Sequence, residues 1–250
     1  MKDWLDDFRL AVGMLTRIPV PHPDGPAPPY LARAHRVFPV VGAAIGAIVG
    51  VVYMALLLIG APALAAAALA LGAGMLVTGA FHEDGIADVT DGFGGGRDKA
   101  AKLEILRDSR IGTYGTLGLL VSFTVKLASL TTLSKWPALA ALIVAHALSR
   151  ALLPAVTRAL PYARADGLGA SAGKCDGPTV AIAAVIGLII ALFCLPIVNV
   201  LLSAVVAVVA VVAIAVLARR QIGGYTGDVL GAAQQCAETA ILLLLAIRSD

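Results

Sequence analysis

The sequence predicts an all-α, polytopic integral membrane protein. Of the 250 residues, 59% are hydrophobic and only 14% are charged, and the mean hydropathy is +0.90. Soluble domains carry about 25% charged residues. In lipid only helices and closed barrels satisfy their backbone hydrogen bonds, and the apolar runs here lack the alternation of barrel strands. No linker divides the chain, so we expect residues 1–250 to form a single membrane-embedded helical bundle.

About seven transmembrane helices follow from the apolar runs, since a helix needs about 20 residues to cross a bilayer. They are expected at 37–59, 62–81, 113–132, 137–154, 178–194, 197–217 and 230–247. The segment 1–36 precedes them and is charged and rich in proline. Within it Trp4, Phe8, Val12 and Leu15 fall near helical spacing. This indicates a helix over 3–16 that either lies along the membrane interface or packs on the bundle.

The basic residues are distributed unevenly between the two sides of this topology. The N-terminal segment and the loops 82–112, 155–177 and 218–229 hold 15 of the 19 lysines and arginines. With seven spans, all four segments lie on one side, which the positive-inside rule places in the cytoplasm. We therefore expect a multi-pass protein of the cytoplasmic membrane, with the N-terminal segment cytoplasmic or interfacial. The three cysteines show no paired spacing.

Three aspartates follow directly after the second apolar run. Asp84, Asp88 and Asp91 recur at spacings of four and three, which places them on one face of a helix. Like charges on one face repel each other, and a divalent cation would relieve the repulsion. Mg2+ prefers oxygen ligands and shares them with substrate phosphates. The pattern predicts a Mg2+ site, with Glu83 as a further candidate ligand that points about 100° away from Asp84.

The polar segment after these aspartates contains further candidates for phosphate binding, metal binding and catalysis. Gly94 and Gly95 belong to a glycine cluster that forms either a backbone nest for a phosphate or a turn. A short amphipathic helix is expected over 98–107. Arg110 suits a phosphate clamp. Asp108 is a candidate metal ligand, a candidate base or the ion-pair partner of a neighbouring arginine.

Two later segments on the same side carry further charges. Arg164 and Lys174 suit an anionic substrate, although cytoplasmic loops are commonly basic. Thr226 and Asp228 precede the last span, where Thr226 is a candidate substrate contact and Asp228 a candidate catalytic acid or metal ligand. Glu238 lies inside that span, and an acid within a membrane is a functional hint by its position; the alternative is a buried neutral acid or a hydrogen bond to Arg150.

Several of these blocks, in this order, resemble the cobalamin synthase (adenosylcobinamide-GDP ribazoletransferase) family. The Asp-Gly stretch is also similar to the motif of CDP-alcohol phosphatidyltransferases, whose site uses aspartates on two adjacent helices. Here Asp88 stands where that motif has an arginine. The matching blocks are Leu15–Pro21, Phe81–Gly92, Leu103–Gly115, Pro161–Arg164, Gly167–Gly169 and Gly224–Ala232.

The resemblance implies the last assembly step of the cobalamin nucleotide loop. Adenosylcobinamide-GDP and α-ribazole, or α-ribazole 5′-phosphate, would give adenosylcobalamin, or its 5′-phosphate, and GMP. Mg2+ is the expected cofactor and the lipid bilayer the expected environment; a homo-oligomer is compatible, and no nucleic-acid partner is expected. The alternatives are a CDP-alcohol phosphotransferase of phospholipid synthesis, which would release CMP, and a cation transporter, which would need acids near mid-membrane and discontinuous helices.

Overall fold

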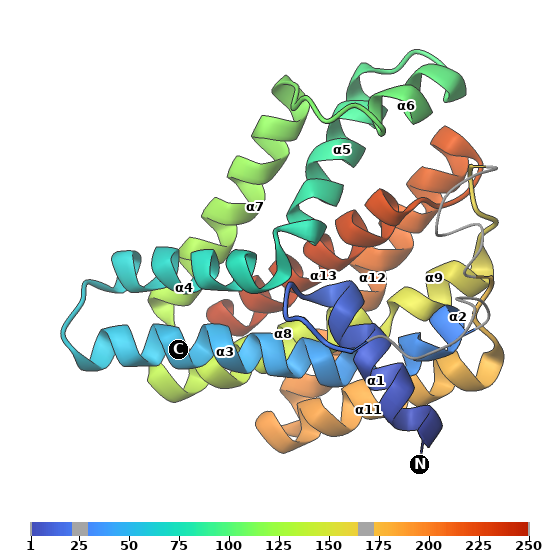
Figure 1. Ribbon diagram of the computed structural model, residues 1–250. Coiled ribbons are helices and arrows are strands. Elements are labelled where there is room, and N and C mark those ends of the chain that lie inside the picture. Colours follow the sequence, from blue (N-terminus) through green and yellow to red (C-terminus); the bar gives the residue numbers. More distant parts are fainter. Residues whose placement is uncertain (1, 22–29, 165–172, 250) are drawn as a thin grey trace.

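The computed structural model describes residues 2–21, 30–164 and 173–249, and in these residues the protein is built from helices (Figure 1). The N-terminal part comprises α1 (Lys2–Leu15), α2 (Tyr30–Ala34) and the short 3-10 helix η1 (His35–Val37). The remaining helices are α3 (Phe38–Leu58), α4 (Ala63–Thr78), α5 (Phe81–Gly95), α6 (Lys99–Ile105), α7 (Thr113–Thr132), α8 (Lys135–Ala151), α9 (Leu153–Ala159), α11 (Gly177–Cys194), α12 (Ile197–Ile222) and α13 (Gly227–Ile247).

The expectation of an all-α membrane protein is confirmed. In the described parts of the chain, six helices are long and apolar enough to cross a membrane, or seven if the bent pair α4–α5 counts as one span. The span expected at 113–132 coincides with α7. The spans expected at 137–154, 178–194, 197–217 and 230–247 correspond to α8, α11, α12 and α13, with ends that differ by a few residues.

The span expected at 62–81 is shorter than predicted: α4 ends before Gly79 and counts as a span only together with α5. Helix α4 ends at Thr78, Gly79 and Ala80 adopt positive φ angles of 68° and 56°, and α5 leaves at 93° to α4. The backbone N–H of Arg17 donates to the carbonyl of Val77 at 2.7 Å, so the segment after α1 packs against this bend. Uniformly apolar composition carries no signal for such a turn.

Helix α8 lies at the centre of the bundle and packs most extensively on α3. Gly42, Gly46 and Gly50 recur every fourth residue along α3, and a Cβ at Gly42 or Gly46 would collide with the α8 backbone. Small residues at this spacing let membrane helices approach closely, because no side chain separates the backbones. Tyr53 extends the contact to α7 by donating to the carbonyl of Leu130 at 2.7 Å.

The N-terminal helix α1 packs on the bundle, which is one of its two expected roles. Val12 and Leu15 of α1 are buried against the bundle, whereas Trp4 and Phe8 are 45% and 40% exposed. Asp7 is fully buried and pairs with Arg33 at 3.0 Å and Arg36 at 2.7 Å, which ties α1 to α2 and η1. One face of α1 thus packs on the protein while large apolar side chains remain outside.

Candidate active site at the crossing of α5 and α13

Helices α5 and α13 cross where two glycines meet. A Cβ at Gly85 would lie 2.7 Å from the carbonyl oxygen of Asp228 and 3.0 Å from the Cα of Gly231. A Cβ at Gly231 would in turn lie 3.3 Å from the Cα atoms of Gly85 and His82. The two backbones therefore touch at this point. The contact brings the aspartates of α5 beside the first turn of α13.

Four carboxylates gather around the crossing. Asp88 is half-buried and experiences the charges of Asp84, Asp91 and Asp228, all repulsive, and that of Arg164, which is attractive. Asp84 is exposed. Within the described residues, neither the Asp84 nor the Asp88 carboxylate has a hydrogen bond or ion pair from the protein. The cluster thus holds more negative charge than its surroundings neutralise.

Asp91 has a role that its spacing did not indicate. Its carboxylate accepts the backbone N–H of Gly112 at 2.7 Å and that of Gly115 at 2.8 Å, at the start of α7. A Cβ at Gly112 or Gly115 would collide with this carboxylate, so glycine at both positions allows the approach. Asp91 therefore caps a neighbouring helix, as carboxylates near helix N-termini favourably do. Its four or so acceptor positions leave others available to a cation.

Asp228 is held at the start of α13 by two neighbours. The Nη2 of Arg164 and the hydroxyl of Thr226 each donate to Asp228 Oδ2 at 3.1 Å. The Thr226 hydroxyl also accepts the N–H of Val229 at 3.3 Å and so caps α13, while the same Arg164 nitrogen donates to the carbonyl of Leu106 at 3.1 Å. Arg164 thereby connects the loop before α7 to the carboxylate cluster.

The donor chemistry of the cluster fits Mg2+, because carboxylate oxygens are the ligands that this ion prefers. In the described chain, however, no three side chains of His, Cys, Asp or Glu stand close enough together to hold a metal ion. A full set of protein ligands is not needed, because Mg2+ is usually held by one or two carboxylates together with substrate phosphates. Asp84 and Asp88 are the two carboxylates of the cluster without a hydrogen bond or ion pair in the described chain.

A cavity of about 460 Å3 adjoins the cluster, within the range of about 300–1,000 Å3 that is usual for small-molecule sites. It is bounded by Asp228, Arg164 and Arg107 together with aromatic and aliphatic side chains. Part of its wall comes from Tyr162 and Tyr225, whose rings meet edge to face at 5.3 Å. The two backbones pair beside them, with Tyr225 N–H donating to Pro161 at 3.0 Å and Ala163 N–H donating to Tyr225 at 2.8 Å.

Other candidate residues lie apart from the cluster. Gly94 and Gly95 continue α5 as helix, so the expected phosphate nest is absent there: a helix uses its amides internally, and Gly94 instead makes room for the Tyr114 ring. Asp108 and Arg110 pair with each other at 2.6 Å on the surface, and Arg110 lowers the pKa of the Asp108 carboxyl. Lys174 is exposed, and the block 167–169 lies outside the described residues.

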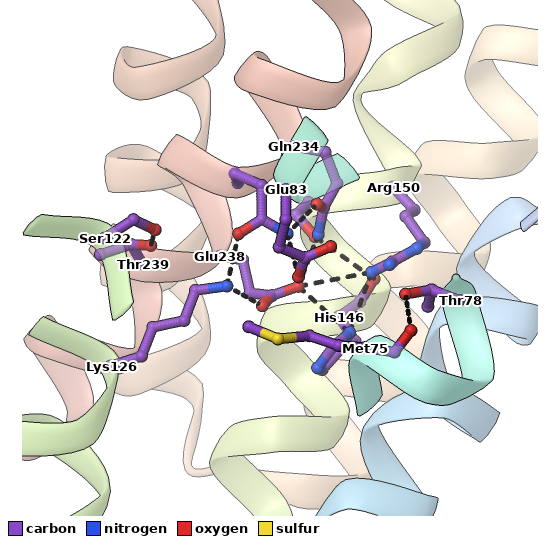
Figure 2. A network of polar contacts seen from close by, with 12 residues as sticks. Met75, Thr78, Glu83, Ser122, Lys126, His146, Arg150, Gln234, Glu238 and Thr239 are labelled. Atoms are coloured by element: carbon purple, nitrogen blue, oxygen red, sulfur yellow. Dashed lines mark hydrogen bonds and ion pairs between the residues drawn. The ribbon is translucent and has the colours of Figure 1, made fainter. Parts of the chain in front are cut away.

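Glu83 turns toward a second polar cluster, buried among the membrane-spanning helices (Figure 2). Its carboxylate accepts from Gln235 at 3.0 Å, and Lys126 donates to both Gln235 and Glu238 at 2.6 Å. Arg150 and His146 approach Glu238 from α8 at 3.5 Å and 3.1 Å. We name these residues the intramembrane network, which joins α5, α7, α8 and α13: Glu83, Lys126, His146, Arg150, Gln234, Gln235 and Glu238.

The hydrogen bond between Arg150 and Glu238 was one alternative expected from the sequence, and it is present at 3.5 Å, whereas the other contacts of the network were not expected. A signal for the rest is present, because Lys126, His146 and Arg150 also interrupt apolar spans. Ionisable residues inside membranes usually face the bundle interior and pair with one another. Which of them meet depends on helix rotation, which the sequence does not specify.

Comparisons with known proteins agree over almost the whole chain. The family described as cobalamin-5-phosphate synthase matches residues 7–246. A protein named adenosylcobinamide-GDP ribazoletransferase from Bradyrhizobium diazoefficiens is 42% identical over 98% of this chain and 95% of its own length. A protein of the same name from Sinorhizobium medicae is 41% identical over 99% of this chain and 98% of its own length. No solved structure matches the chain.

Proposed function

Because this chain belongs to the cobalamin-5-phosphate synthase family, we propose that it is an adenosylcobinamide-GDP ribazoletransferase. The ribose 3′ oxygen of α-ribazole, or of its 5′-phosphate, forms a bond to the phosphorus nearest the cobinamide. The bond from that phosphorus to the bridging oxygen of GMP breaks. GMP leaves with the bonding electrons, and the hydroxyl proton passes to a base.

The carboxylate cluster is the observation that supports this chemistry best. Asp84 and Asp88 lack protein partners in the described chain, and Asp91 and Asp228 flank them at the α5–α13 crossing. We assign the proposed Mg2+ to Asp84 and Asp88 with Asp91 beside them. When bound, Mg2+ would neutralise the diphosphate charge and so favour phosphoryl transfer. Glu83 faces the intramembrane network, and we assign it no metal contact.

The protein's own residues supply position and a proton acceptor. Arg164 lies beside both the cluster and the cavity, where its guanidinium suits a phosphate oxygen. Asp228 is the carboxylate that bounds the cavity, and it is the best placed to accept the proton of the attacking hydroxyl. Holding two reactants in line is the main requirement of such a displacement, because it replaces a bimolecular encounter by a local one.

We also propose that the site faces the cytoplasm in the cytoplasmic membrane. The segments that flank it, 82–112, 155–177 and 218–229, hold ten of the 19 lysines and arginines, and cytoplasmic loops carry an excess of these residues. A homo-oligomer stays a prediction.

The test is an assay of detergent-purified protein with adenosylcobinamide-GDP, α-ribazole 5′-phosphate and Mg2+. We expect GMP and the corrinoid product to form together, and both to be lost in Asp84→Ala. Glu104→Ala removes an exposed acid of α6 and is the matched control. Full activity of Asp84→Ala would overturn the site assignment. Release of CMP from a CDP-alcohol donor, with no GMP released, would favour the phospholipid reaction instead.

A further inference from the structure

We propose that the cavity beside Asp228 is the binding site of the acceptor, an aromatic ribonucleoside, and that the corrinoid donor stays outside it. This inference rests on the proposed transferase function. The cavity holds about 460 Å3, within the range of about 300–1,000 Å3 that is usual for sites of small ligands. A corrin ring with its amide side chains and upper adenosyl group is several times larger than one benzimidazole nucleoside. Size therefore excludes the corrin part of the donor from this cavity, but not its guanosine part.

The walls of the cavity suit an apolar heterocycle. Phe38, Leu153, Tyr162 and Tyr225 contribute aromatic and aliphatic surface from four separate segments of the chain. The base of α-ribazole is a dimethylated benzimidazole with a single free ring nitrogen. Guanine, in contrast, carries several donors and acceptors. The walls are largely apolar but include His35, His82 and Thr157, and those groups of guanine that found no partner there would be buried at a cost. The walls thus favour the acceptor base over the guanine of the donor.

The polar end of the cavity matches the rest of the nucleoside. Asp228 bounds the cavity and belongs to the carboxylate cluster, so a ribose 3′-hydroxyl placed there would lie beside the reacting phosphorus. Arg164 already pairs with Asp228. Arg107 bounds the same cavity and follows Leu106, whose carbonyl accepts from Arg164. We assign the 5′-phosphate of a phosphorylated acceptor to Arg107.

The first test fills the cavity. Leu230 of α13 lies in its wall and is half-buried. Leu230→Trp should raise the KM for α-ribazole at least 10-fold and leave the KM for adenosylcobinamide-GDP within 2-fold. Leu243→Trp is the matched control, because Leu243 is on the same helix but is 44% exposed and bounds none of the cavity. Equilibrium dialysis of α-ribazole, without donor, should show binding to the control and not to Leu230→Trp.

The second test changes the residue to which the 5′-phosphate is assigned. Arg107 is exposed, and Arg107→Gln should raise the KM for α-ribazole 5′-phosphate about 10-fold without changing the KM for unphosphorylated α-ribazole. An unchanged KM for both acceptors in both variants, or a rise confined to adenosylcobinamide-GDP, would overturn the acceptor assignment while the transferase function stood. Absence of GMP release from the unaltered protein would instead reject the function itself.

Discussion

Gly85→Ala tests whether the α5–α13 contact sets the reaction geometry. The added Cβ would lie 2.7 Å from the Asp228 carbonyl oxygen, about 0.7 Å short of the 3.4 Å at which ordinary contact begins. The atoms that this Cβ would approach, Asp228 O and Gly231 Cα, both belong to the backbone. The clash can therefore be relieved only if helices α5 and α13 move apart. Overpacking of this kind costs about 1–3 kcal/mol of stability. A displacement approaching 1 Å between catalytic groups lowers rates by up to about 100-fold.

We therefore expect Gly85→Ala to lower kcat about 10- to 100-fold while the protein still inserts and elutes as a single species. The assay is GMP release at saturating substrates, alongside the thermal midpoint in detergent. Gly72→Ala is the matched control, since a Cβ there meets nothing within 4 Å, and alanine favours a helix over glycine by about 1 kcal/mol. A Gly85→Ala variant with unaltered kcat would refute the view that this close contact aligns the carboxylates.

Removal of divalent cations by EDTA should abolish GMP release, and added Mg2+ should restore it; turnover that persists in EDTA would contradict the metal assignment. Asp91→Asn should destabilise the protein by about 1.5–3 kcal/mol, because a charge-assisted cap is lost, and hydrogen exchange should quicken at Gly112 and Gly115. Unchanged exchange there would argue against the cap. Glu238→Gln should cost about 3–5 kcal/mol, because it leaves Lys126 and Arg150 buried without their carboxylate. Thermal melts should show partial recovery in Glu238→Gln/Lys126→Met, and no recovery would exclude this pairing as the cause.

The membrane architecture could be predicted because it depends on composition and run length alone. Helix α7 coincides with its apolar run for this reason. The helix end at Thr78 lies in an apolar run, so composition and run length did not show it, although a glycine in the left-handed conformation is a common way for a helix to end. Run length also could not predict the 93° turn into α5, at which Ala80 adopts a positive φ that is uncommon for a residue with a Cβ.

The candidate site, too, could be predicted only in part from the sequence. The spacing of Asp84, Asp88 and Asp91 correctly indicated one helix, and α5 carries all three. The spacing did not indicate that Asp91 would cap α7, because that contact depends on how α7 docks against α5, which is a long-range property. The ion pair of Asp108 with a neighbouring arginine was one of the three roles expected for it, and it is confirmed with Arg110, only two residues away.

Helix α13 connects the carboxylate cluster to the intramembrane network. Asp228 and Gln235 are seven residues apart, which is about two helical turns and returns to the same face. Asp228 belongs to the carboxylate cluster, and Gln235 donates a hydrogen bond to Glu83, the residue next to Asp84. The start of α5 is therefore fixed against α13 at two levels, by glycine contact and by a buried hydrogen bond. Because charged groups buried in a membrane are costly unless they pair, this network fixes the rotation of α5 more strictly than apolar packing would. That rotation determines which way Asp84 and Asp88 face.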